Sequence, residues 1–126
     1  MTRSFLTLIL AGFATTAFTG PQMVAEATYD QKPDPTLKLA ASNGLMEADK
    51  DFFNHTSKQD IDLSLDAAKI SEEKTVINFS FKNHKDGSVI LSRFYTFLGS
   101  YGEVCDGVRE RTALLYKEVS DQLSNH

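Results

Sequence analysis

Apolar residues recur every three or four positions between residues 35 and 55, which is the period of a helix with one buried face. The stripe is formed by Leu37, Ala41, Leu45, Ala48 and Phe52. Asp34 precedes it as a candidate N-cap, and Pro35 suits the first helical position. The pattern predicts a helix over 35–55. Gly44 is its weak point, because glycine within a helix costs about 1 kcal/mol against alanine, so the segment is either one helix or two short ones.

The period of the apolar pattern then falls to two, which predicts strands with one buried face. In the first strand, over 61–67, the apolar positions are Ile61, Leu63, Leu65 and Ala67. In the second, over 75–81, they are Ile77, Phe79 and Phe81. A turn containing Gly87 leads to a third strand over 88–98. Short loops join the three strands, so an antiparallel meander is the simplest topology.

A second helical pattern follows Gly99. Ser100 and Glu103 have the spacing of a capping box, in which a serine cap is matched by a glutamate three residues on. The apolar stripe is formed by Val104, Val108, Leu115, Val119 and Leu123. Gly102 and Gly107 weaken the first turns, so we expect the firm part of this helix to begin near Val108. The predicted fold class is α+β: an N-terminal helix, a three-stranded antiparallel meander and a C-terminal helix, with both helices on one face of the sheet.

The start of the chain has a different pattern, in which Arg3 precedes an apolar run from Phe5 to Phe18. At about 1.5 Å per helical residue the run reaches roughly 21 Å, which is short for a hydrocarbon core of about 30 Å. Such a run, followed by small residues, is typical of a secretory signal peptide. Cleavage after Ala17 and after Ala27 are both compatible with the sequence, and alanine at both recognition positions favours Ala27. The alternative is an uncleaved N-terminal anchor. We expect contact with a membrane only in that case.

This interpretation divides the chain into a signal peptide over 1–27, a flexible polar arm over 28–34 and a single small domain over 35–126. We therefore expect an exported protein that works in the periplasm or outside the cell. The net charge is −4, and it is unchanged when the leader leaves with Arg3 and Glu26. An acidic domain is a poor partner for phosphate backbones, so no nucleic-acid binding is expected.

The third strand is apolar on both faces, unlike a strand with one solvated face. One face carries Leu91, Arg93, Tyr95 and Phe97. The other carries Ile90, Ser92, Phe94, Thr96 and Leu98. If the helices cover the second set, the first forms an aromatic strip around Arg93, and arginine and aromatic side chains dominate binding hot spots. The sequence therefore predicts this first set as the binding site for a protein partner or a second copy of the chain. The alternative is a central strand with both faces buried.

Cys105 is the one cysteine of the chain. In an oxidising compartment it is a buried thiol, a partner in an intermolecular disulfide or a reactive nucleophile. Val104 and Val108 lie beside it on the helical stripe and favour burial. Glu103 and Asp106 disfavour the thiolate, whereas a position early in a helix favours it. Burial is the interpretation that the sequence favours.

Motifs for catalysis and metal binding give little signal. The histidines are His55, His84 and His126, and they lack metal-ligand spacing. Asp60, Asp62 and Ser64 resemble the start of a calcium loop, but the glycine and the bidentate glutamate are missing. We therefore predict no catalytic residues, no metal and no cofactor. The sequence favours a non-enzymatic binding or assembly module. The alternatives are a small hydrolase or thiol-dependent redox protein using Cys105 or a carboxylate pair, and a carrier of a small apolar ligand.

Overall fold

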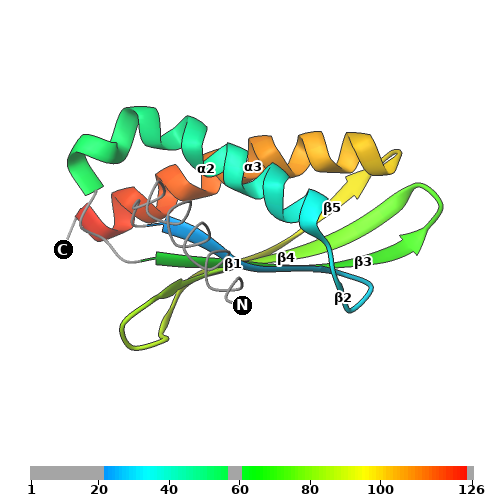
Figure 1. Ribbon diagram of the computed structural model, residues 1–126, viewed down its shortest axis with the longest axis horizontal. Coiled ribbons are helices and arrows are strands. Elements are labelled where there is room, and N and C mark those ends of the chain that lie inside the picture. Colours follow the sequence, from blue (N-terminus) through cyan, green and yellow to red (C-terminus); the bar gives the residue numbers. More distant parts are fainter. Residues whose placement is uncertain (1–21, 57–60, 125–126) are drawn as a thin grey trace, which may run out of the picture.

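The structure is a computed structural model that describes residues 22–56 and 61–124. Its elements in chain order are β1 (Gln22–Tyr29), β2 (Lys32–Pro33), α2 (Pro35–Thr56), β3 (Ile61–Ser71), β4 (Lys74–Asn83), β5 (Val89–Leu98) and α3 (Tyr101–Ser124). The strands form one layer, and both helices lie over one face of it (Figure 1). The predicted α+β class is therefore confirmed.

The strands form a single mixed sheet in the order β2-β1-β3-β4-β5. β3, β4 and β5 are joined by short loops and pair antiparallel, whereas β1 lies parallel to β3. A parallel pair needs a long crossover connection, and α2 supplies it. The prediction of a three-stranded antiparallel sheet is wrong, because residues 22–29 add a strand beside β3 and the short β2 follows it.

β1 lies where the sequence placed the end of the leader and the start of a flexible arm. Its Val24 and Ala27 are 6% and 5% exposed and belong to the core. The N–H of Asp30 donates to the carbonyl oxygen of Ala67 at 2.8 Å, which ties the following turn to β3. Segment 28–34 is therefore not a free arm, because it completes β1, turns and forms β2. The apolar run from Phe5 to Phe18, on which the predicted signal peptide depends, lies outside the described residues.

The core fills the space between the sheet and the helix layer. On the sheet, strand alternation turns one set of side chains toward the helices, namely Ile61, Leu63, Leu65, Ala67, Ile77, Phe79 and Phe81. The helices contribute buried members of the predicted stripes, together with the fully buried Tyr116, and the main members are Leu37, Ala41, Leu45, Val104, Val108, Leu115 and Val119. Burial of this apolar surface, at about 25 cal/mol per Å², is the main stabilising contribution to the fold.

α2 runs unbroken through Gly44, which settles the choice between one helix and two. Gly44 lies where α3 crosses α2. A Cβ atom on Gly44 would overlap the carbonyl oxygen of Arg109 and lie 3.0 Å from the Cβ of Thr112. The glycine that weakens the helix in isolation is therefore the residue that lets the two helices pack closely.

α3 begins with the capping box that the sequence predicts. The N–H of Ser100 donates to Oε1 of Glu103 at 2.8 Å, and the N–H of Glu103 donates to Oγ of Ser100 at 3.3 Å. These reciprocal bonds satisfy two N–H groups at the helix start. The helix is therefore regular from Tyr101, and the expectation that its firm part starts near Val108 is wrong.

Candidate functional site

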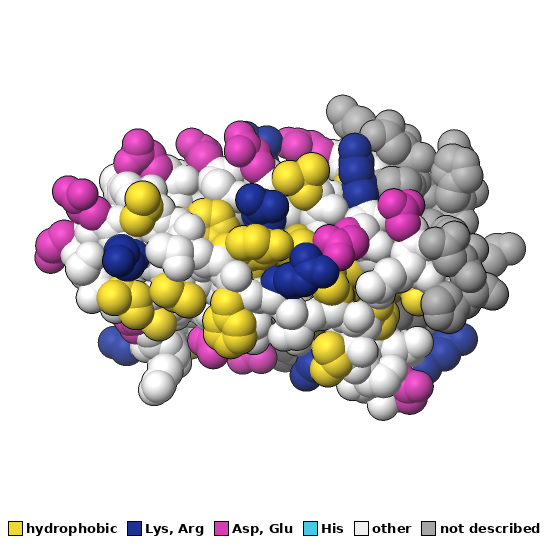
Figure 2. Space-filling view, turned by 180° about the vertical axis from the view of Figure 1, so that it is seen from behind, with side chains coloured by type: hydrophobic (Ala, Val, Ile, Leu, Met, Phe, Trp, Pro, Cys, Tyr) yellow, Lys and Arg dark blue, Asp and Glu magenta, His cyan; other side chains and the backbone are white. Residues whose placement is uncertain are grey.

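β5 lies at one edge of the sheet, and within the part of the chain that the structure describes its ladder partner is β4 alone. Along the ten residues of β5, the backbone N–H and C=O groups that do not face β4 point away from the sheet. Figure 2 views the molecule from behind, on the side of β5 and α3, and shows apolar side chains gathered among Lys and Arg side chains. An exposed edge strand of this kind is a template for pairing with another chain.

The face of β5 that meets the helices is the one that carries the predicted site residues. Arg93 lies opposite Phe79 in the ladder, and Phe79 is fully buried beneath the helix layer. Because directly opposed residues share a face of the sheet, the set with Arg93 faces the helices. The condition that the helices cover the set with Phe94 is therefore not met. The alternative of a central strand is also wrong, because β5 is an edge strand.

Two side-chain contacts join this face of β5 to α3. The Arg93 guanidinium makes a two-pronged hydrogen bond with the Glu118 carboxylate, from Nη2 to Oε2 at 2.6 Å and from Nη1 to Oε1 at 3.3 Å. The bond to Glu118 raises the pKa of Arg93, and a hydrogen bond to Tyr95 adds to this. About two turns nearer the N-terminus of α3, the Arg111 guanidinium lies 4.4 Å from the centre of the Tyr95 ring. Arg93 and Tyr95 are thus both held by side chains of α3.

Exposure decides which residues of the strand are accessible. Leu91 is 8% exposed and belongs to the core, so almost none of its side chain is accessible to a partner and its burial does not support the prediction that it is a binding residue. The Arg93 side chain is 43% exposed, and Tyr95 and Phe97 are partly buried. On the open face of the sheet, Phe94 is 70% exposed and Leu98 is 69% exposed. We define the β5 edge surface as Arg93, Phe94, Tyr95, Phe97, Leu98 and Leu114 of α3, which is 55% exposed.

A second cluster joins the N-termini of the two helices. Oδ1 of Asp34 accepts the N–H groups of Thr36 and Leu37 at 3.1 and 3.0 Å, which confirms Asp34 as the N-cap of α2. The Tyr101 hydroxyl lies 2.7 Å from both carboxylate oxygens of Asp34. Burial raises the pKa of the Tyr101 hydroxyl, and the hydrogen bond to Asp34 raises it further. The cluster ties the first turn of α3 to the first turn of α2.

Cys105 lies beside this cluster and is partly buried. Burial raises the pKa of its thiol, and the negative charges of Asp34 and Asp106 act in the same direction, against a hydrogen bond from Tyr101 that lowers it. The protonated thiol is therefore favoured at neutral pH, whereas a nucleophilic cysteine needs a depressed pKa and a basic neighbour. The ionisable groups that act on the thiol are the carboxylates of Asp34 and Asp106 and the phenol of Tyr101, which suit a structural thiol.

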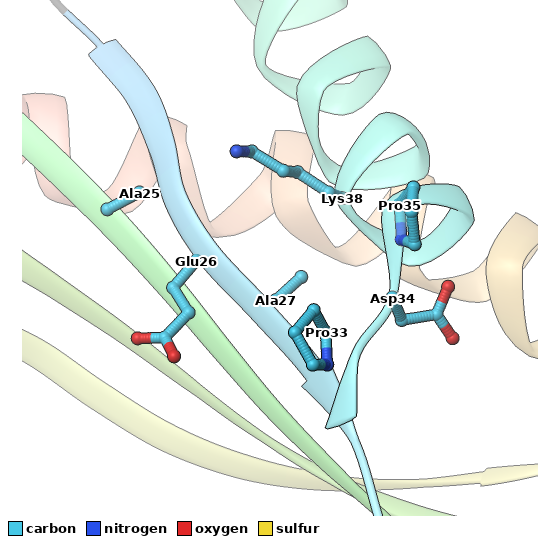
Figure 3. A pocket seen from close by; sticks show the side chains of 7 residues that line it. All are labelled: Ala25, Glu26, Ala27, Pro33, Asp34, Pro35 and Lys38. Carbon is cyan, nitrogen blue, oxygen red and sulfur yellow. The ribbon is translucent and has the colours of Figure 1, made fainter. Parts of the chain in front are cut away.

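A shallow hollow of about 310 Å³ lies beside β1 and the start of α2. It is lined by Ala25, Glu26, Ala27, Pro33, Asp34, Pro35 and Lys38. In Figure 3 the Lys38 side chain and the Asp34 carboxylate point in opposite directions, and Asp34 is the residue that receives the Tyr101 hydroxyl. The lining includes the carboxylates of Glu26 and Asp34, but no hydrogen bond or ion pair joins either of them to Lys38 among the described contacts, so we do not assign a catalytic site to this hollow.

Histidines and carboxylates are not gathered into a metal centre in the described residues. Nδ1 of His84 lies 2.8 Å from Oδ2 of Asp62 at the exposed end of β3 and β4. Asp62 is the one carboxylate of the calcium-like stretch that the structure describes, and it is paired with His84. The side chains of His55 and His126, and residue Asp60, lie outside the described part.

Together these features define a small α+β domain with two helices on one face of a five-stranded mixed sheet and one open apolar edge. No family model and no curated protein matches the chain. Among solved structures it is similar to the crystal structure of protein XCC0632 from Xanthomonas campestris, assigned to the family model DUF330, with 12% identity, a TM-score of 0.48 and coverage of 84% of this chain and 88% of that one. Neither described helix has the length and hydropathy needed to span a membrane.

Proposed function

We propose that the protein is a small exported binding or assembly module without enzymatic activity, and that it contacts a protein partner or a second copy through the β5 edge surface. The observation that carries this proposal is the ten-residue edge strand with Phe94 and Leu98 about 70% exposed. Monomeric proteins usually protect such edges with lysine, proline or a covering segment. β5 contains neither lysine nor proline.

The side-chain content of the surface also supports a binding role. Tyr95 and Phe97 lean on the buried Phe79, with ring centres 5.8 and 6.2 Å away, so they present partly exposed but fixed aromatic surface. Phe97 is also held against Gly107 of α3, where a Cβ atom would come within 2.7 Å of the Phe97 ring. Aromatic groups that are already fixed lose little conformational entropy when a partner covers them.

Export is proposed from the leader sequence, with cleavage after Ala17. A cut after Ala27 would remove residues 22–27 of β1 together with the buried Val24. A cut after Ala17 leaves β1 whole and satisfies the small-residue requirement. N-terminal sequencing of the protein recovered from the periplasm or medium should begin at Phe18. A chain that begins at Thr28, or an intact Met1, contradicts this part of the proposal.

The contact surface is tested by photo-cross-linking in cells that make the protein. A photoreactive phenylalanine analogue replaces Phe94, which is 70% exposed, in one variant and Leu39, an apolar residue of α2 that is 59% exposed, in the matched control. We expect a specific cross-linked product from position 94, identified by mass spectrometry, and much less from position 39. Products of equal yield from both positions, or none from position 94, would refute the proposed surface.

A further inference from the structure

The direction of the backbone groups on β5 follows from its pairing with β4. The N–H of Gly99 donates to the carbonyl oxygen of Glu73, directly opposite, at 2.9 Å. In an antiparallel ladder, pairs that exchange hydrogen bonds alternate with pairs that do not. Continuing from Gly99 in steps of two, Arg93, Tyr95 and Phe97 direct their N–H and C=O groups to β4. Ser92, Phe94 and Thr96 therefore direct theirs to the open edge.

This alternation of inward-pointing and outward-pointing backbone groups limits how a second β5 strand can pair with the edge about a twofold axis. An axis at Arg93 would place two Arg93–Glu118 ion pairs side by side, with Arg93 opposite Arg93 and Glu118 toward Glu118, and like charges in such positions are destabilising. An axis at Phe94 pairs Phe94 with the partner's Phe94 and Ser92 with the partner's Thr96, and all of these residues have outward-pointing backbone groups. The same axis places Arg93 opposite the partner's Tyr95, so that no two like charges meet on that face of the sheet.

The positions of the α3 side chains also favour a twofold axis at Phe94. Arg93 contacts Glu118 and Tyr95 lies under Arg111, so Phe94 is level with the part of α3 between those two residues. Leu114 lies on that stretch and is 55% exposed. An axis at Phe94 therefore runs two α3 helices antiparallel, with Arg111 toward the partner's Glu118 and Leu114 toward its own copy. An axis at Tyr95 would instead bring two Arg111 side chains together.

An inward-pointing charge on an edge strand often prevents pairing. Here the charge of Arg93 is already matched by Glu118 at 2.6 Å, so a second strand does not have to bury an unpaired cation. We propose that the partner of the β5 edge surface is a second copy of this chain, joined through antiparallel β5–β5 pairing about a twofold axis at Phe94. The inference rests on the proposed function, because it names the occupant of the proposed surface.

The test exploits the fact that, in this register, residue 94 meets its own copy. The processed wild-type protein is expected to be a dimer by analytical ultracentrifugation, and F94E and F94K are each expected to weaken dimerisation at least tenfold. An equimolar mixture of F94E and F94K should recover the dimer, because opposite charges then face each other across the axis. L39E, at an exposed apolar residue of α2, is the matched control and should leave dimerisation unchanged.

A wild-type protein that stays monomeric up to several hundred micromolar overturns the inference, and so does a dimer that F94E leaves intact or a mixture that does not recover. Circular dichroism of each variant shows that a monomer is still folded, which is expected because Phe94 is 70% exposed. Backbone hydrogen exchange gives a second measure, since the Phe94 and Thr96 amides should become protected only in the dimer. A monomer that still cross-links to another protein from position 94 overturns self-pairing and leaves the proposed function standing.

Discussion

Two glycines in the helices should respond in opposite directions to the same substitution. Gly44 lies at the crossing of α2 and α3, where a Cβ atom would overlap the backbone oxygen of Arg109. Gly102 lies in the first turn of α3, and a Cβ atom there would meet nothing within 4 Å. The same methyl group is therefore added to a closed site in one case and to open space in the other.

The magnitudes follow from two opposing effects. Alanine within a helix is favoured over glycine by about 0.8–1 kcal/mol. At Gly44, the backbone of α3 has to move to accept the methyl group, and such overpacking costs about 1–3 kcal/mol. Gly44→Ala should therefore lower the free energy of unfolding by about 1 kcal/mol, whereas Gly102→Ala should raise it by about 0.4–1 kcal/mol.

Urea unfolding followed by circular dichroism at 222 nm measures both variants against the wild type. We expect the midpoint to fall for Gly44→Ala and to rise for Gly102→Ala, with unchanged slopes. In a domain of this size, a difference of about 1 kcal/mol corresponds to roughly 4–8 °C in melting temperature. If Gly44→Ala is as stable as Gly102→Ala, the close helix crossing at Gly44 is refuted.

The remaining predictions concern the ionisable groups at the helix N-termini. The folded-state pKa of Tyr101 is raised by burial and by Asp34, so its contribution to stability is complete below the ordinary phenol pKa of about 10 and is lost as the pH rises toward the folded value. Unfolding measured from pH 9 to pH 11 should show a steeper loss for wild type than for Tyr101→Phe, and equal slopes would contradict the assignment. Burial also raises the pKa of Cys105, so alkylation by iodoacetamide at pH 7.5 should be at least tenfold slower in the folded chain than in urea. Rapid labelling of the native protein would instead favour the thiol-dependent enzyme.

Much of the local structure could be predicted from residue types and spacing. Asp34 and Ser100 identify the helix starts because their side-chain oxygens can accept N–H groups a few residues ahead, and both caps are present. The alternation in β3 and β4 likewise fixes which side chains are buried, because successive residues of a strand point to opposite faces. These features depend on interactions between residues that are close in the sequence.

The candidate site depends on contacts between strands and helices that residue spacing does not show. β5 is apolar on both faces, so its sequence was equally compatible with either face toward the helices. The predicted aromatic strip required the helices to cover the set with Phe94, whereas Phe94 is 70% exposed. The ladder with β4 decided the matter, since Arg93 lies opposite the buried Phe79.

The amino-acid sequence alone determined the two helices and the buried face of β3 and β4, because each follows from local periodicity and capping. The tertiary structure decided the rest. β1 is part of the sheet because it pairs in parallel with β3. The paired residues are far apart in the sequence: Gln22 lies opposite Ile61, 39 positions later. That pairing supplies hydrogen bonds and burial that this short segment does not reveal by itself. With β1 in place on one side of β3, β5 becomes the far edge, and its open backbone and exposed Phe94 exist only as a consequence of that sheet order.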